Sequence, residues 1–441
     1  MNKKKLLFQV FLAIAALLLV LTVITWVFDQ QQYSGPLLTF SFIFLAASFH
    51  GFKNLKKFAY TVWIFAAVTI SMNYPSYFRE LGGVNLQILI VPLLQIIMFG
   101  MGSQLSVKNF ADVIKMPKGV GVGVVSQFTI MPIVGFTVAT IFGFPAEIAA
   151  GIILVGSSPS GLASNVMTFI AKANLALSVT LTTVATLLAP IMTPFLMKTL
   201  AGRFVPIDFW DMMLTIVNIV ILPIIAGLIF NTIGYVKEKR RNIFLQIMIF
   251  VLIIVLKNFI DFQTTDVALE AQMGTLLQDV LLFQALPIAA ALVLRRLAGG
   301  NRAWLDRAMS LISMVGIGII ITIITAAGRD SLIEIGLALV LACLIHNILG
   351  YLLGYWGCRL IRMKEHDARA VALEVGMQNG GLASGIALEM GKVATVGLAP
   401  AVFGPMMNVT GSSLANIWRS KPLKDEKTDE STQQTSEVPT K

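Results

Sequence analysis

The chain has 441 residues, of which 56% are hydrophobic and only 13% are charged, and its mean hydropathy is +0.82. This composition excludes an ordinary soluble globular protein and indicates a polytopic membrane protein. The formal net charge of +10 comes from basic residues dispersed over many short loops. Such a distribution is typical of membrane topology and of contact with anionic lipid, so we expect a lipid bilayer and no nucleic acid as partner.

The apolar runs predict an all-α protein with about fourteen transmembrane helices, because each crossing needs roughly 17–25 residues. In chain order the expected spans are residues 6–28, 35–50, 57–75, 86–103, 119–142, 146–171, 174–197, 209–234, 243–261, 277–294, 305–327, 332–358, 368–391 and 395–418. The second span is short, so a re-entrant segment is the alternative there. The first span begins like a signal peptide, but it is too long and no small-residue cleavage site follows, so we interpret it as a retained helix.

Lysine and arginine are concentrated in alternate loops, which indicates the cytoplasmic side of the membrane. The basic loops include Lys53, Lys56, Lys57, Lys108, Lys115, Lys118, Lys237, Lys239, Arg240 and Arg241. The opposite loops are poor in basic residues, and the stretch around Asp266 and Glu270 is acidic. Both termini are therefore predicted to be cytoplasmic in a multi-pass protein of the cell membrane, and the polar tail, residues 421–441, is expected to be disordered.

The first chemically informative segment, Gly156-Ser-Ser-Pro-Ser-Gly161, interrupts the span 146–171. Pro159 lacks an amide proton and clashes with the preceding turn, and the flanking glycines permit non-helical dihedral angles. The helix is predicted to unwind here, and backbone groups freed at membrane depth must face protein or a water-filled cavity. A simple proline kink is the alternative, but polar residues continue beyond the kink, which favours a binding site.

A second interruption, Glu374-Val-Gly-Met-Gln-Asn-Gly-Gly381, carries a carboxylate in an apolar segment. An acidic residue at mid-membrane costs roughly 2.5–3.5 kcal/mol, so it needs a partner. Lys257 or Arg307 from other spans is one candidate, and a cation such as sodium, held by carboxylate, amide, hydroxyl and carbonyl oxygens, is favoured. A protonated Glu374 is the rival, and it would make the protein proton-coupled.

Both interruptions carry the same short string, in Ser160-Gly-Leu-Ala-Ser164 and Gly380-Gly-Leu-Ala-Ser384, at matching positions of the two halves. Interrupted helices at corresponding positions of a duplicated membrane protein indicate a transporter with an inverted repeat. The string by itself also recurs by chance, because small residues allow close helix packing. Since no histidine or aspartate accompanies the serines and G-x-S-x-G is absent, we expect no enzyme.

Three separated motifs stand in this order along the chain: Gly156-Ser-Ser-Pro-Ser-Gly-Leu-Ala-Ser-Asn-Val-Met167, Asn174-Leu-Ala-Leu-Ser-Val-Thr-Leu-Thr182 and Glu374-Val-Gly-Met-Gln-Asn379. Together they resemble the bacterial branch of the bile acid:sodium symporter family. The resemblance implies a ten-helix core built as an inverted repeat of five, in which two broken helices cross near the midplane. It predicts an extra transmembrane pair at 1–56, a first repeat at 57–202, and a second repeat at 203–420 with extra helices near 243–294.

The resemblance also implies the site residues and the function. The first sodium site falls on Ser164, Asn165, Ser178, Thr182 and Glu374. The second falls on Gln127, Glu374, Val375, Met377 and Gln378, and the substrate residues are Asn379 and Asn408. Leu162 and Met407 stand where relatives often have polar residues, which argues against bile acid or a pantoate-like substrate. The function implied is sodium-coupled symport of a small organic anion by alternating access, with a proton-coupled transporter or exchanger as the alternative.

Overall fold

The computed structural model describes residues 3–52, 55–105, 115–235, 240–264, 269–297 and 302–421. Within these residues the chain is almost entirely helical, and its two short strands, β1 (Glu80–Leu81) and β2 (Val84–Asn85), form an antiparallel hairpin. The all-α fold class is thereby confirmed. Outside the described residues lie Lys53, Lys108, Lys237, Lys239 and Asp266 of the topology prediction, and the tail after Lys421.

The first half of the chain contains five long helices and the short α4 before the broken helix, and one helix after it, with several short turns. These elements are α1 (Lys3–Val27), α2 (Gln31–Phe49), η1 (Lys56–Phe58), α3 (Ala59–Asn73), α4 (Pro75–Arg79), η2 (Leu86–Leu89), α5 (Ile90–Gln104), α7 (Pro117–Phe142), α8 (Ala146–Ser157), α9 (Leu162–Ile170), α10 (Leu175–Leu196) and η3 (Met197–Ala201). The broken helix predicted at 146–171 corresponds to α8 and α9.

The second half contains two helices with a π-helical turn inside them, four continuous helices and the second broken helix. Its elements are α11 (Phe209–Ile216), η4 (Val217–Ile221), α12 (Leu222–Gly234), α13 (Arg240–Thr264), α14 (Leu269–Val280), η5 (Leu281–Ala285), α15 (Leu286–Leu297), α16 (Arg302–Ala327), α17 (Arg329–Leu360), α18 (Glu365–Gly376), α19 (Gly380–Glu389) and α20 (Leu398–Arg419). The second broken helix consists of α18 and α19.

Nine helices in the described part of the chain are long and apolar enough to cross a membrane. The apolar helices α3 and α8 are shorter than this, and each broken helix divides its length between two halves. A polytopic membrane protein is therefore confirmed, whereas the total of fourteen crossings remains a prediction.

Several helix ends follow from local chemistry. Pro117 occupies the first turn of α7, where its missing amide proton costs nothing, and Gly143 ends this helix with a φ of 64°. Asn174 and Asp208 cap α10 and α11 because their side chains accept hydrogen bonds from the backbone amides of Leu177 and Asp211.

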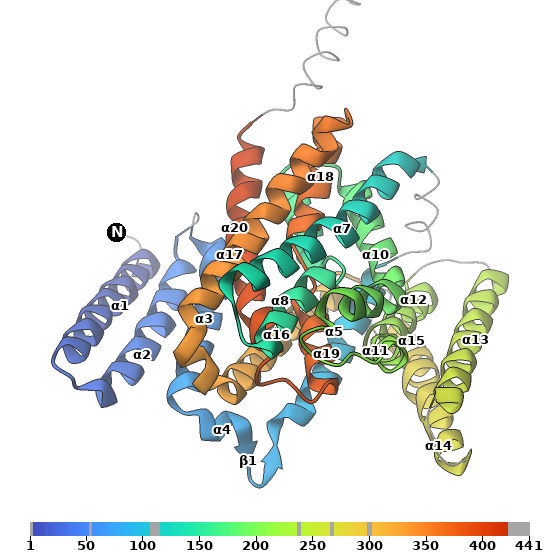
Figure 1. Ribbon diagram of the computed structural model, residues 1–441, viewed down its shortest axis with the longest axis horizontal. Coiled ribbons are helices and arrows are strands. Elements are labelled where there is room, and N and C mark those ends of the chain that lie inside the picture. The colour runs from blue at the N-terminus through green and yellow to red at the C-terminus, as the bar shows by residue number, and fades with distance from the viewer. Residues whose placement is uncertain are drawn as a thin grey trace, which may run out of the picture.

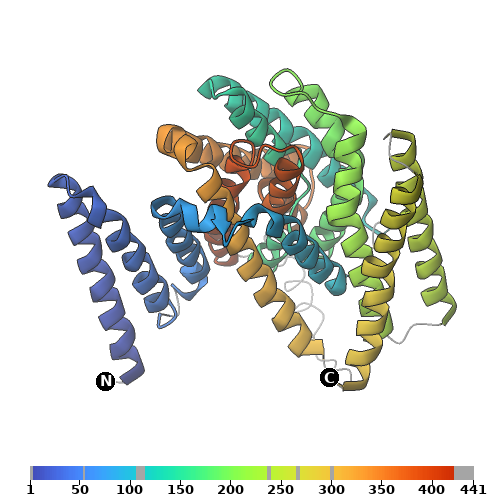
Figure 2. The same ribbon diagram turned by 90° about the horizontal axis from the view of Figure 1, so that it is seen from below.

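The broken helices lie at the centre of the molecule, with α1 and α2 at one flank and α13 and α14 at the other (Figures 1 and 2). At one flank α1 pairs with α2, which packs against α3; at the other, α13 and α15 pack against α12. The other contacts between the two halves correspond to each other. Helix α3 of the first half packs against α16 of the second, and α12 of the second half packs against α5 of the first. The predicted extra helices are placed differently in the two halves, since α1 and α2 precede α3 whereas α13 to α15 follow α12.

Glycine lets α5 and α12 approach closely. A Cβ atom at Gly102 would lie 2.0 Å from the carbonyl oxygen of Ile224, and one at Gly227 would lie 2.2 Å from that of Phe99. Small residues at helix crossings in membranes allow the backbones to come into direct contact. This contact fixes α5, which lines both of the cavities described below.

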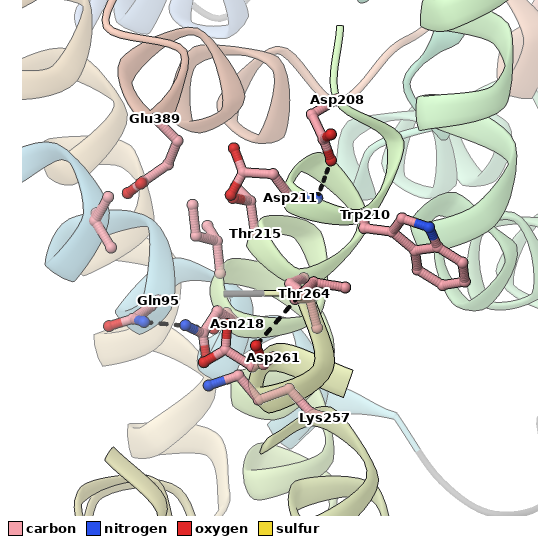
Figure 3. Close-up of a pocket in the computed structure, with 13 residues that line it drawn as sticks. Gln95, Asp208, Trp210, Asp211, Thr215, Asn218, Lys257, Asp261, Thr264 and Glu389 are labelled. Atoms are coloured by element: carbon pink, nitrogen blue, oxygen red, sulfur yellow. Dashed lines mark hydrogen bonds between the residues drawn. The ribbon is translucent and has the colours of Figure 1, made fainter. Parts of the chain in front are cut away.

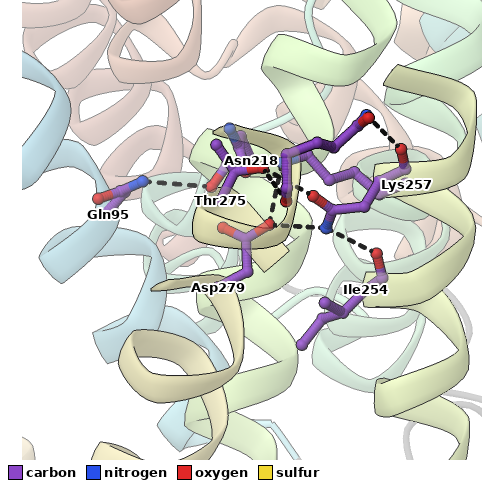
Figure 4. A network of polar contacts seen from close by, with 8 residues as sticks. Gln95, Asn218, Ile254, Lys257, Thr275 and Asp279 are labelled. Carbon is purple, nitrogen blue, oxygen red and sulfur yellow. Dashed lines mark hydrogen bonds and ion pairs between the residues drawn. The ribbon is translucent and has the colours of Figure 1, made fainter. Parts of the chain in front are cut away.

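A buried polar network joins α13 and α14 (Figure 4). Lys257 Nζ lies 2.9 Å from Asp279 Oδ2, and the Asn258 side-chain amide donates to the same oxygen at 3.0 Å. Lys257 therefore has a carboxylate partner of its own, and it is not the partner of Glu374. The other candidate, Arg307, is exposed on α16 and makes none of the hydrogen bonds that Glu374 accepts.

Candidate functional site

The two interrupted segments meet and pair with each other. Ser160 and Gln378 form an isolated antiparallel bridge. The amide of Asn379 donates to the carbonyl oxygen of Pro159 at 2.8 Å, and the amide of Gly161 donates to that of Met377 at 3.3 Å. Backbone groups freed by each break are thus satisfied by the other break, as burial away from water requires. Both predicted interruptions are confirmed, and we call this junction the crossing.

Glu374 lies at the crossing with only 2% of its surface exposed. Its carboxylate accepts four hydroxyl hydrogen bonds, from Ser160 at 2.5 Å, Ser164 at 2.6 Å, Ser178 at 2.5 Å and Thr182 at 2.8 Å. The hydroxyls come from the first break, from α9 and from α10, whereas Glu374 belongs to α18. A buried carboxylate of the second half is therefore surrounded by hydroxyls of the first half.

The five residues of the first predicted sodium set lie together. Besides the contacts to Glu374, the side-chain oxygen of Asn165 lies 2.8 Å from the hydroxyl oxygen of Ser178 and 3.3 Å from that of Thr182. Ser178 and Thr182 share one face of α10 because residues four apart on a helix are neighbours. Ser164 and Asn165 reach the same point because α9 begins directly after the break.

The second predicted set is also contiguous. The side-chain nitrogen of Gln127 donates to the carbonyl oxygen of Ser158 at 3.0 Å and to Oε1 of Gln378 at 2.7 Å. Gln378 Nε2 donates in turn to the carbonyl oxygen of Val375 at 2.5 Å. Oε1 of Gln127 is buried and accepts no hydrogen bond within the described residues. A buried acceptor without a donor fits a cation ligand, because leaving such an atom unsatisfied is costly.

The groups at the crossing that could hold a cation are the carboxylate of Glu374 and uncharged oxygen atoms. No group of three or more histidine, cysteine, aspartate or glutamate side chains suited to a metal ion occurs among the described residues. Within the same part of the chain, none of the ion pairs involves Glu374. The arrangement therefore fits a hard cation of low charge better than a transition metal.

A cavity of about 170 Å³ borders the crossing, and both predicted substrate residues, Asn379 and Asn408, line it. Asn379 Oδ1 caps α19 by accepting from the amide of Leu382 at 3.0 Å, whereas its buried Nδ2 has no hydrogen-bond partner in the described structure. Leu162 and Met407 line the cavity as well. Most other lining residues are apolar, among them Ile64, Leu94, Ile97, Met98, Met101, Ile317, Ile320 and Ile321.

The sequence resembles known proteins over most of its length. A sodium-dependent transporter of Bacillus subtilis named YocS, itself uncharacterised, is 33% identical over 376 residues, which cover 84% of this chain and 95% of that protein. The model of the sodium bile acid symporter family matches residues 91–261. The chain belongs to this family. A probable sodium/metabolite cotransporter of Arabidopsis thaliana chloroplasts, BASS1, is 28% identical over 361 residues, 82% of this chain and 73% of that protein.

Membership of the sodium bile acid symporter family agrees with the resemblance drawn from the motifs. One functional contact was missed by the motifs, because Ser160 was treated as part of the break and not as a partner of Glu374. The available signal was its position next to Pro159. The residue after this proline lies in the extended segment of the first break, which faces the second break. Its hydroxyl now accounts for one of the two shortest hydrogen bonds to Glu374.

A larger cavity, of about 680 Å³, lies on the predicted extracellular side between α5, α11, α13 and α19. Figure 3 shows Asp208, Asp211 and Glu389 around one part of it and Lys257 with Asp261 around another. A cleft with several carboxylates raises the local concentration of cations. No residue of the predicted sodium or substrate sets lines this cavity, and no sequence motif indicated it, since its acidic residues come from distant segments.

Proposed function

We propose that the protein is a sodium-coupled symporter of a small organic anion. The observation that carries the proposal is the buried Glu374 carboxylate at the crossing, held by four hydroxyls and by no cationic side chain of the described structure. The names of its relatives, a sodium-dependent transporter and a sodium/metabolite cotransporter, support sodium as the coupling ion.

Sodium would bind at two adjoining sites that share Glu374. The first comprises Ser164, Asn165, Ser178, Thr182 and Glu374, and the second comprises Gln127, Glu374, Val375, Met377 and Gln378. A hydroxyl has one proton and two lone pairs, so Ser178 and Thr182 would keep donating to the carboxylate while a lone pair faces the ion. In the second site the unpartnered Oε1 of Gln127 would supply a side-chain oxygen and the break would supply carbonyl oxygens.

The organic anion would bind in the cavity beside the crossing. The N-termini of α9 and α19 border this cavity, and helix N-termini favour negative charge. Asn379 Nδ2 would donate to the anion, with Asn408 nearby. The lining contains no lysine or arginine among the described residues, and its volume is below the roughly 300–1,000 Å³ of drug-sized sites. Together with Leu162 and Met407, these features favour a small anion with an apolar body over a bile acid.

Transport would proceed by alternating access. Residues 57–202 and 203–420 form the two repeats in this proposal, and α3, α5, α12 and α16 form the panel against which the broken helices rock. The two cavities support this, because Leu94 of α5 lines the one at the crossing, whereas Val91 and Gln95 of the same helix line the predicted extracellular one. A tilt of α5 relative to α19 would connect the crossing to one side at a time.

Sodium is expected to raise the apparent unfolding temperature of the purified protein above its value in potassium at equal ionic strength, because a ligand bound only by the folded form stabilises it. A thermal-shift screen of organic acids with and without sodium should then reveal an acid whose effect requires sodium. Its uptake into liposomes should follow a sodium gradient. Uptake driven by a pH gradient and unchanged without sodium would favour the proton-coupled alternative.

Asn379→Asp is expected to weaken binding of that acid about tenfold, a difference of about 1.4 kcal/mol. Aspartate still caps α19, but it replaces the amide donor with a second acidic oxygen that repels an anion. The Michaelis constant for uptake measures the effect, and the sodium-dependent shift in unfolding temperature serves as the control for an intact crossing. Equal Michaelis constants for the variant and the wild type would show that Asn379 does not contact the anion.

A further inference from the structure

The contact between α10 and α18 carries a row of polar residues that extends beyond the sodium sites. Asp367 and Glu374 are seven residues apart on α18, about two turns, so they share a face. On α10, the cap residue Asn174 is followed at intervals of four by Ser178 and Thr182, which also share a face. The two faces meet, since Asn174 contacts Asp367 and both hydroxyls contact Glu374.

Asn174 makes three kinds of contact at the predicted cytoplasmic end of this row. Its Nδ2 donates to Asp367 Oδ1 at 2.7 Å, and its backbone amide donates to the carbonyl oxygen of His366 at 3.3 Å. Its Oδ1 accepts from the amide of Leu177 at 3.0 Å and so caps α10. The start of α10 is therefore tied to the start of α18, although the two helices belong to different repeats.

The lengths of the two helices make this tie relevant to the ion site. At a rise of 1.5 Å per residue, Glu374 lies roughly 10 Å along α18 from Asp367. Ser178 and Thr182 lie roughly 6 and 12 Å along α10 from Asn174, so the distance of Glu374 from Asp367 falls between these two values. A slide of one helix against the other would separate the hydroxyls from Glu374, and the Asn174 contact to Asp367 opposes this slide.

We propose that Asn174 and Asp367 are positioning residues that fix the register of α10 against α18 and so assemble the sodium site at Glu374. The proposal rests on the proposed function, because it requires sodium to bind there. Neither residue touches the ion; both act through Ser178, Thr182 and Glu374.

A similar tie at the opposite end of the broken helices provides a comparison. Glu147, in the first turn of α8, accepts hydrogen bonds from Lys392 and, at 2.6 Å, from Thr395, in the loop between α19 and α20. The residue seven positions after Glu147 is Leu154, so no ion ligand follows on that face. Loss of this second tie should leave sodium binding unchanged.

The first test compares Asp367→Ala with Asp367→Asn. Both remove the same charge, but asparagine retains an oxygen that accepts from Asn174. The sodium concentration that gives half-maximal thermal stabilisation is expected to rise about tenfold for alanine and to stay within about threefold of wild type for asparagine, if the hydrogen bond sets the register. Glu147→Ala, which removes the carboxylate that accepts both hydrogen bonds of the second tie, is the matched control and should leave this concentration unchanged.

The second test is Asn174→Asp. Aspartate still caps α10, but its carboxylate is placed against the carboxylate of Asp367. An added negative charge near the site would by itself attract sodium, whereas loss of register weakens sodium binding, so the two effects have opposite signs. We expect the half-maximal concentration to rise. The exchange Asn174→Asp with Asp367→Asn restores a hydrogen bond with donor and acceptor reversed, and it should return the value close to wild type.

A purely structural role would lower the unfolding temperature without sodium and leave the half-maximal concentration unchanged. Equal values for Asp367→Ala and Asp367→Asn, or no recovery in the exchanged pair, would overturn the positioning role while leaving the proposed function intact. Absence of any sodium effect on the wild-type protein would instead overturn the sodium site and the positioning role together.

Discussion

Replacing Glu374 with glutamine is expected to abolish both sodium-dependent uptake and sodium-dependent thermal stabilisation. Glutamine has nearly the same shape, but it removes the negative charge that accepts hydrogen bonds from Ser160, Ser164, Ser178 and Thr182. Hydrogen bonds to a charged group contribute about 1.5–3 kcal/mol each. A sodium ion bound at this site would also lose the negative charge that balances its own. Uptake of the screened acid and the thermal shift in sodium against potassium measure the two effects.

The matched control for this prediction is Glu374→Asp, which keeps the charge and shortens the side chain by one methylene. It should weaken sodium binding without abolishing it, because the carboxylate no longer reaches all four hydroxyls. The glutamine variant should remain folded, since hydroxyls can turn to accept from the new amide. A glutamine variant that still responds to sodium like the wild type would refute the role of Glu374 in coupling.

Replacing Lys257 with methionine is expected to destabilise the protein by about 3 kcal/mol, because breaking a buried ion pair leaves an uncompensated charge. The side chains of Lys257 and Asp279 are only 7% and 10% exposed, and their closest atoms are 2.9 Å apart. In the variant, Asp279 retains the neutral donor Asn258 in place of the lysine charge. Thermal denaturation of the purified variant, compared with the wild type in the same detergent, measures the loss.

Removing both charges, in Lys257→Met with Asp279→Leu, should restore most of the stability, because replacing a whole buried pair by apolar residues is often nearly neutral. The half-maximal sodium concentration should stay unchanged in both variants, since the ion pair joins α13 to α14 and takes no part in the hydrogen bonds of Glu374 among the described residues. A double variant as unstable as the single one would show that the pair is needed for more than charge balance.

Several features of this protein were determined by local sequence. Pro159 with its flanking glycines, and the glycines around Gln378 and Asn379, were sufficient to predict where two helices unwind, because they act through backbone chemistry within one turn. The carboxylate of Glu374 in an apolar segment likewise predicted a partner, since its cost in a membrane does not depend on the details of the fold. The ligand set itself came from the resemblance to a family.

Other features were decided only by tertiary structure. The hydrogen bond from Ser160 to Glu374 and the tie between Asn174 and Asp367 join segments about two hundred residues apart. The pairing of Lys257 with Asp279 and the acidic cavity between α11, α13 and α19 also depend on which helices become neighbours. Each of these contacts requires two side chains to meet at the same depth. That depth is set by the packing of whole helices, and no pattern within either segment encodes it.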